Sequence, residues 1–190
     1  MRKEYLIAFA ILVLAIAISY IATIKTVNNS VSQASKDTAG SIAYHSMVYI
    51  SLNGKEIYKS PNIVVDSGLN YIKQCTGRGQ CGSAAAGNFS YIALGNITSG
   101  GQDTTDTSLA NEWASCGLTR GAGVYTDIGT GNWSLSKVWT ATGACLVNTT
   151  GLFNATSGDT MFAENNFTTV SLQANDQINV TWTIWVTSSG

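Results

Sequence analysis

The sequence predicts a mostly β protein: an antiparallel β-sandwich or jelly roll with one or two short helices, preceded by an N-terminal hydrophobic helix. Three observations predict it. Apolar and polar residues alternate in short runs from residue 41 onward, glycine-rich turns separate these runs, and residues 5–24 are apolar throughout. Short strands at a spacing of about 8–12 residues are typical of sandwiches and barrels. A parallel α/β fold would need more helix than this sequence offers.

The N-terminal segment is the strongest local signal. Residues 5–24 (YLIAFAILVLAIAISYIATI) follow Arg2 and Lys3 and end before Lys25. A run of this length crosses a bilayer core of about 30 Å as a helix, and the preceding positive charges place the rest of the chain outside. We therefore divide the chain into a signal peptide or membrane anchor (1–25), a polar tail or linker (26–40) and a β-sandwich domain (41–190). Small residues at Ala17 and Ser19 suit cleavage, whereas the length of the run suits a retained anchor, and both remain open.

Strand alternation is clearest at the two ends of the outer domain. Residues 42–52 place apolar side chains on one parity, and Asn53-Gly54 then predicts a hairpin with residues 55–58. Residues 176–187 (DQINVTWTIWVT) read as a half-buried antiparallel strand. Further strands are expected near residues 89–94, 120–126, 133–140, 144–148, 161–164 and 168–172. Two short helices are expected near 67–74, capped by Asp66, and near 107–114, capped by Asp106.

The surface chemistry is unusual because charged residues make up only 11% of the chain, against about 25% in ordinary domains. A net charge of −1 offers no basic field for nucleic acid, so that class of partner is excluded. Ser, Thr, Asn and Gly provide the polar surface instead, and attached glycan would add solvation. Candidate glycosylation sites of the pattern Asn-x-Ser/Thr are Asn28, Asn88, Asn96, Asn132, Asn148, Asn154, Asn166 and Asn179.

Four cysteines form an even set in a chain with an export signal, so disulfides are expected. Three pairings are possible. We favour Cys75 with Cys81, closing a small glycine-rich loop, and Cys116 with Cys145, joining two strands. A zinc site is disfavoured because no Cys-x-x-Cys knuckle is present and His45 is the only histidine.

Residues for catalysis are sparse. His45 is the single imidazole and is expected on the strand face opposite the core, so no nucleophile–base pair is evident. The acidic residues sit beside Gly, Thr or Asn and read as turn and cap residues. Asp103 and Asp106 form a weak candidate for calcium, with helix capping the simpler interpretation. We expect no enzyme activity and no cofactor.

An ordered set of short motifs resembles a β-rich domain of structural proteins from tailed phages and archaeal viruses, and of related archaeal surface proteins. The motifs are 65–69 (VDSGL), 92–96 (IALGN), 106–112 (DTSLANE), Arg120, 151–155 (GLFNA), Gly158 and 180–184 (VTWTI). They cover about two-thirds of the chain. The resemblance implies a non-enzymatic structural or virion protein.

The overall plan of export segment, polar tail, charge-poor sandwich, glycan sites and disulfides also resembles subunits of archaeal extracellular threads and bundling pili. That resemblance implies a homopolymer in which an N-terminal strand of one subunit completes the sheet of the next. Residues 20–32 would be that strand, with Ile21, Ile24 and Val27 as its buried anchors. The alternative is a membrane-anchored virion or cell-surface protein whose outer domain acts in attachment. Either protein would lie outside the cell after membrane export.

Overall fold

The computed structural model describes residues 41–78, 88–158 and 160–189. The expected N-terminal helix, the polar tail and the candidate donor residues all lie outside these ranges. The chain divides into two compact units, and the larger one, Tyr44–Thr187, contains nearly all of the described residues.

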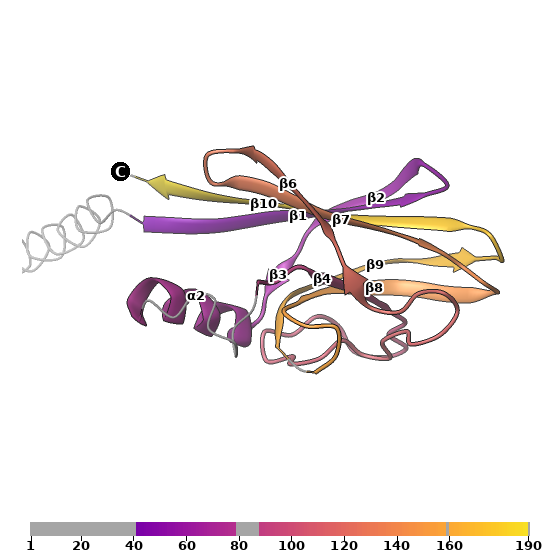
Figure 1. The fold of residues 1–190 in the computed structure, drawn as a ribbon. Helices are drawn as coiled ribbons and strands as arrows, with labels where there is room; N and C mark the ends of the chain where they lie inside the picture. Colours follow the sequence, from indigo (N-terminus) through magenta and orange to yellow (C-terminus); the bar gives the residue numbers. More distant parts are fainter. Residues whose placement is uncertain (1–40, 79–87, 159, 190) are drawn as a thin grey trace, which may run out of the picture. The chain divides into compact units, whose positions relative to one another are not determined.

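Two antiparallel five-stranded sheets dominate the described chain, in a sandwich-like arrangement that confirms the predicted mostly β class (Figure 1). One sheet, here called sheet A, has the order β2-β1-β10-β7-β6, and the other, sheet B, has the order β3-β9-β8-β4-β5. The strands of sheet A are β1 (Ser41–Leu52), β2 (Lys55–Pro61), β6 (Val124–Gly129), β7 (Asn132–Thr140) and β10 (Gln177–Ser189). The strands of sheet B are β3 (Ile63–Val64), β4 (Tyr91–Gly95), β5 (Gly121–Ala122), β8 (Cys145–Phe153) and β9 (Met161–Leu172).

The alternation in the sequence locates the core. In β10, Ile178, Val180, Trp182 and Ile184 are buried at 0–1% exposure, as the parity of this strand predicts. In β1, the neighbouring strand of the same sheet, Val48 and Ile50 are also fully buried. The turn between β1 and β2 has positive φ at both Asn53 and Gly54, which is the geometry that an Asn-Gly hairpin provides. Sheet A therefore follows closely from local sequence rules.

The helix α2 (Asp66–Arg78) confirms the expected helix near 67–74 and extends beyond it. Its first turn packs tightly on sheet B. The Ser67 hydroxyl donates to the Met161 carbonyl oxygen, and a Cβ built on Gly68 would lie 2.2 Å from the Phe162 carbonyl oxygen. Glycine at this position is what allows the helix backbone to approach β9 so closely.

The second expected helix, near 107–114 with Asp106 as its cap, is wrong. This segment is an irregular loop in which Glu112 forms an isolated bridge with Gly95. Asn111 has a left-handed φ of 47°, which interrupts any helix, and the backbone N–H of Trp113 donates to the Leu94 carbonyl oxygen at 2.8 Å. The loop thus pairs with the end of β4 instead of bonding to itself.

Two further differences concern sheet B. The strands expected at 161–164 and 168–172 are one continuous strand, β9, and β8 runs on to Phe153 where a shorter strand was expected. The two-residue strand β3 was not expected at all. It follows β2 directly, so the chain leaves sheet A at Pro61 and enters sheet B at Ile63.

Candidate functional site

His45 does not lie in a catalytic arrangement within the described part of the chain. Its side chain is exposed on β1, opposite the core as expected, and stacks on Trp185 with ring centroids 5.6 Å apart. Its Nε2 lies 3.2 Å from the Thr187 hydroxyl. The nearby Ser46 hydroxyl donates to the Asn62 side-chain oxygen and not to His45. These contacts describe a surface aromatic pair between β1 and β10.

The carboxyl groups of Asp106 and Glu164 meet at the backbone N–H of Asp103. The backbone N–H of Asp103 donates to both Asp106 Oδ2, at 3.0 Å, and Glu164 Oε1, at 2.9 Å. Burial, together with the adjoining Asp106 carboxyl, raises the pKa of Glu164 to about 7. Asp103 Oδ1 accepts bonds from the Thr105 N–H and hydroxyl, which lower the pKa of Asp103.

These bonds make Asp103 and Asp106 loop-ordering residues. Among the described residues, no group of three or more His, Cys, Asp or Glu side chains is placed to hold a metal ion. The weak calcium candidate at Asp103 and Asp106 therefore gains no support from this geometry. Asp106 also caps no helix, because the helix expected after it does not form.

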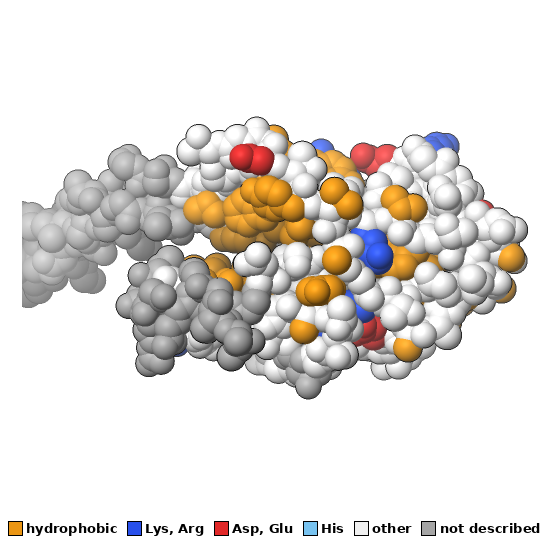
Figure 2. Space-filling model, in the orientation of Figure 1, with side chains coloured by type: hydrophobic (Ala, Val, Ile, Leu, Met, Phe, Trp, Pro, Cys, Tyr) orange, Lys and Arg blue, Asp and Glu red, His pale blue; other side chains and the backbone are white. Residues whose placement is uncertain are grey.

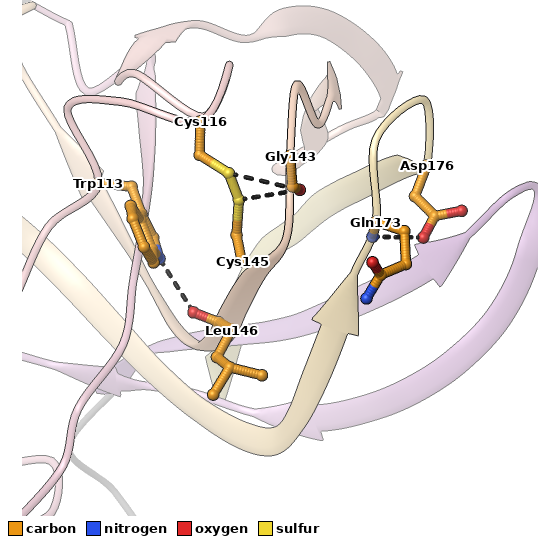
Figure 3. The surroundings of a disulfide bond; sticks show 7 residues. All are labelled: Trp113, Cys116, Gly143, Cys145, Leu146, Gln173 and Asp176. Atoms are coloured by element: carbon orange, nitrogen blue, oxygen red, sulfur yellow. Dashed lines mark hydrogen bonds between the residues drawn. A yellow bond between two sulfur atoms is a disulfide. The ribbon is translucent and has the colours of Figure 1, made fainter.

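Cys116 and Cys145 form a disulfide with their Cα atoms 6.7 Å apart, which joins the loop before β5 to the start of β8 (Figure 3). Trp113 covers this region and donates from Nε1 to the Leu146 carbonyl oxygen at 3.0 Å. The favoured pairing of Cys75 with Cys81 cannot be followed in the structure, because Cys81 lies outside the described residues. Cys75 itself is disulfide-bonded.

Several motif residues that are far apart in the sequence meet in one cluster around Arg120. Its guanidinium forms an ion pair with Glu112, and its Nη1 donates to the Gly158 carbonyl oxygen at 2.9 Å and to that of Ala155 at 3.3 Å. The guanidinium carbon lies 3.5 Å from the centroid of the Phe153 ring. The cluster joins three loops, which is a structural role.

The glycosylation candidates differ in their surroundings, and Asn28 lies outside the described residues. Asn148 uses its amide to bridge to the Ile97 backbone: Nδ2, the atom that would carry a glycan, donates to the Ile97 carbonyl oxygen at 2.8 Å. Asn132, Asn166 and Asn179 each have a buried Oδ1 with no hydrogen-bond partner among the described residues. Asn88 is exposed, and Asn96 and Asn154 are half-buried.

One side of the sandwich is incompletely closed. On its β3 side, β9 pairs only at Ala163 and Glu164, because β3 is two residues long. Residues 170–172 of β9 pair with β8, residues 167–169 lie at a register shift of that pairing, and none of residues 167–172 has a described strand on the other edge. The nearest neighbour there is β2, whose Tyr58 hydroxyl donates to the Asn166 carbonyl oxygen at 2.8 Å.

This opening holds a groove of about 300 Å³, here called the β2–β9 groove. Leu52, Ile57 and Tyr58 line one wall, and residues 168–171 of β9 line the other. Ile57 is 42% exposed. The groove combines apolar side chains with the open edge of a long strand, which are the two features that β-strand addition uses.

A second groove, of about 370 Å³, lies at the other end of the same side. Residues 44–47, Pro61, Asn62, Val64 and Trp185 line it. It forms because β2 pairs with β1 only as far as Met47, so the preceding part of β1 lacks β2 as a neighbour. Its walls combine the polar side chains His45, Ser46 and Asn62 with apolar ones such as Val64 and Trp185.

No family model, curated protein or solved structure matches this chain. Within the residues that the structure describes, none of the helices combines the length and apolar character needed to cross a membrane. Sequence reasoning singled out neither groove wall. Residues 166–172 have the sequence NFTTVSL, which mixes polar and apolar residues as any half-exposed strand does. Nothing in it marks the strand as lacking a neighbour.

Proposed function

We propose that this protein is a non-enzymatic structural subunit of an extracellular surface filament, assembled by strand exchange between copies. The observation that carries the proposal is the open edge of β9 beside the β2–β9 groove. An unpaired strand edge beside a groove that has apolar side chains in one wall is a template for a strand from another chain. The exchange is head-to-tail, and a head-to-tail contact whose rotation does not close into a ring builds an open filament.

Residues 20–32 of a neighbouring copy are the proposed occupant of the groove. Their apolar, β-branched side chains Ile21, Ile24 and Val27 would otherwise face water. In an extended strand Ile21 and Val27 share one face and Ile24 lies on the other, so the groove would bury Ile21 and Val27. Each fully buried Ile or Val contributes about 1.5–3 kcal/mol, and the backbone of the segment gains partners on β9. Residues 167–172 extend over about 17–20 Å, which matches the stretch from Ile21 to Val27 of the donor segment.

The non-enzymatic part of the proposal rests on the surroundings of the titratable groups. His45 stacks on Trp185 and lies beside the Thr187 hydroxyl, and no carboxylate is bonded to it in the described chain. The clustered carboxyls beside β9 bond to loop backbone. The export segment, the disulfide and the scarcity of charge support a location outside the cell.

Charged substitutions in the proposed donor strand test the assembly. Changing Ile21, Ile24 and Val27 together to Asp should leave the purified full chain unable to form filaments, as judged by sedimentation and negative-stain microscopy. The matched control changes Gln33, Ser35 and Thr38 to Asp, which adds the same charge outside residues 20–32 and should leave filaments intact. If the first variant assembles as well as the control, strand donation by this segment is wrong.

A mixing experiment distinguishes exchange between copies from folding back on the same chain. One preparation carries Ile24→Cys and the other carries Thr169→Cys, and the two are co-assembled under mild oxidation. Strand exchange predicts a disulfide between the two different chains. If residues 5–24 instead stay in a membrane and no cross-link forms between chains, strand exchange is wrong. The alternative function, a membrane-anchored protein that acts in attachment, then replaces it.

A further inference from the structure

The two edges of sheet A are built differently. At one edge, β2 carries Lys55, Glu56, Lys59 and Pro61, which are the charges and the proline that protect an edge strand from pairing with other chains. At the other edge, β6 has the sequence VYTDIG, with no proline, no lysine and strong β-formers. The β6 edge therefore lacks the lysines and the proline of the β2 edge, and its one irregularity is the register shift between Asp127 and Gly129, next to the hairpin turn.

The β6 edge is also the more exposed. All six residues of β6 are exposed, and Val124, Tyr125 and Ile128 are exposed at 68%, 62% and 50%. Figure 2 shows a broad hydrophobic area beside the β6–β7 hairpin. The single charge of the strand does not guard it, because Asp127 Oδ1 accepts the Gly129 N–H at 2.9 Å and so orders the hairpin turn.

We propose that β6 is a second contact surface, which pairs antiparallel with β6 of a second copy and joins the two A sheets. The strand is self-complementary when the pairing is centred on Thr126. Val124 then faces Ile128 of the other copy, Tyr125 faces Asp127, and the two Asp127 carboxylates do not oppose each other. Cross-strand pairs of this kind are the unit that stabilises sheets.

This contact is isologous and uses neither residues 20–32 nor the β2–β9 groove. It therefore stands or falls independently of strand exchange. If both contacts form, β6 pairing links one filament, or one unassembled subunit, to another through a two-fold axis. A strand edge alone is a small interface, so the contact is weak between single subunits and strengthens when many copies are joined.

The experiment uses the full chain carrying the three Asp substitutions at Ile21, Ile24 and Val27, which removes donor-strand assembly. In this background Thr126→Cys should form a disulfide-linked dimer under mild oxidation, because opposite residues bring their Cβ atoms to about 4.5–5.5 Å. The control Lys59→Cys, on the protected β2 edge, should not. Equal cross-linking of the two variants, or none by Thr126→Cys, overturns the proposal.

A second measurement does not depend on cross-linking. Thr126→Lys places two like charges opposite each other and should weaken self-association by about fivefold, measured by sedimentation velocity across a range of concentrations. Thr107→Lys adds the same charge to an exposed loop and should have no effect. If the parent chain stays monomeric, or if both lysine variants associate equally, β6 pairing is wrong.

Discussion

Arg120 and Glu112 form an ion pair through two bonds, with Arg120 Nε 2.8 Å from Glu112 Oε1 and Nη2 2.5 Å from Oε2. The Arg120 side chain is only 6% exposed, while that of Glu112 is 25% exposed. The remaining guanidinium nitrogen bonds the carbonyl oxygens of Ala155 and Gly158. A single cation thus holds the loop of Glu112 against the loop that follows β8.

Removing this cation should destabilise the domain. Arg120→Met leaves the Glu112 carboxylate and two carbonyl oxygens without their donor, and loss of one partner of a buried pair costs about 3 kcal/mol. We expect that decrease in the free energy of unfolding, measured by urea denaturation. The double variant Arg120→Met, Glu112→Gln should recover part of the loss. A single variant as stable as the parent chain would show that the pair contributes nothing.

The packing of α2 on β9 depends on Gly68. Gly68→Ala places a methyl group 2.2 Å from the Phe162 carbonyl oxygen, so the helix must move away from the strand. We expect a loss of about 1–3 kcal/mol in the free energy of unfolding, as for other overpacked sites. Gly101→Ala is the matched control, because its Cβ would meet nothing within 4 Å. Equal stability of the two variants would contradict the close approach of helix and strand.

Stability should fall as the pH rises through the range in which Glu164 titrates. Burial holds the pKa of Glu164 at about 7, above its ordinary value of 4.5. Between these values the folded chain binds a proton that the unfolded chain does not, so the free energy of unfolding decreases with rising pH and levels off above pH 7. Below pH 4.5 both states are protonated at Glu164, so the titration of this group no longer changes the free energy of unfolding.

Glu164→Gln separates this effect from other titrations. The amide still accepts the Asp103 N–H and keeps a donor toward Asp106, but it carries no charge at any pH. Chemical denaturation from pH 4 to pH 8 should therefore show a smaller decrease in the variant, and the variant should be the more stable protein at pH 8. The same decrease in both proteins would exclude Glu164 as its origin.

The disulfide between Cys116 and Cys145 should stabilise the folded chain because it lowers the conformational entropy of the unfolded chain. It closes a loop with a sequence separation of 29 residues, for which the chain-entropy relation gives about 3–4 kcal/mol. Replacing both cysteines with Ser should lower the free energy of unfolding by about that amount. Alkylation of the denatured, unreduced protein should label neither cysteine, and labelling of both would contradict the bond.

The sequence predicted sheet A well because its signals are local. Asn53-Gly54 fixes the first hairpin, and the alternation in β10 defines the buried face without knowledge of any partner. The helix expected near 107–114 failed because Leu109 and Trp113, four residues apart, resemble one face of a helix. In the structure Leu109 fills a small second core, while Trp113 bonds to β4 and β8.

The candidate site could not be predicted, because it depends on where the chain changes sheets. The β2–β9 groove exists because the strand after Pro61 crosses to sheet B and pairs with only two residues of β9. No residue near Ile63 or Thr169 signals that geometry locally. The exposure of β6 was likewise hidden, since its alternation resembles that of a covered strand.

The open edge of β9 is the central feature of this account, and amide hydrogen exchange tests it most directly. Residues 167–172 are compared between assembled protein and protein carrying Asp at Ile21, Ile24 and Val27. Strand exchange predicts that the outward-facing amides exchange at least about tenfold more slowly in the assembly, because a donor strand bonds to them. Equal exchange rates in the two states would contradict it.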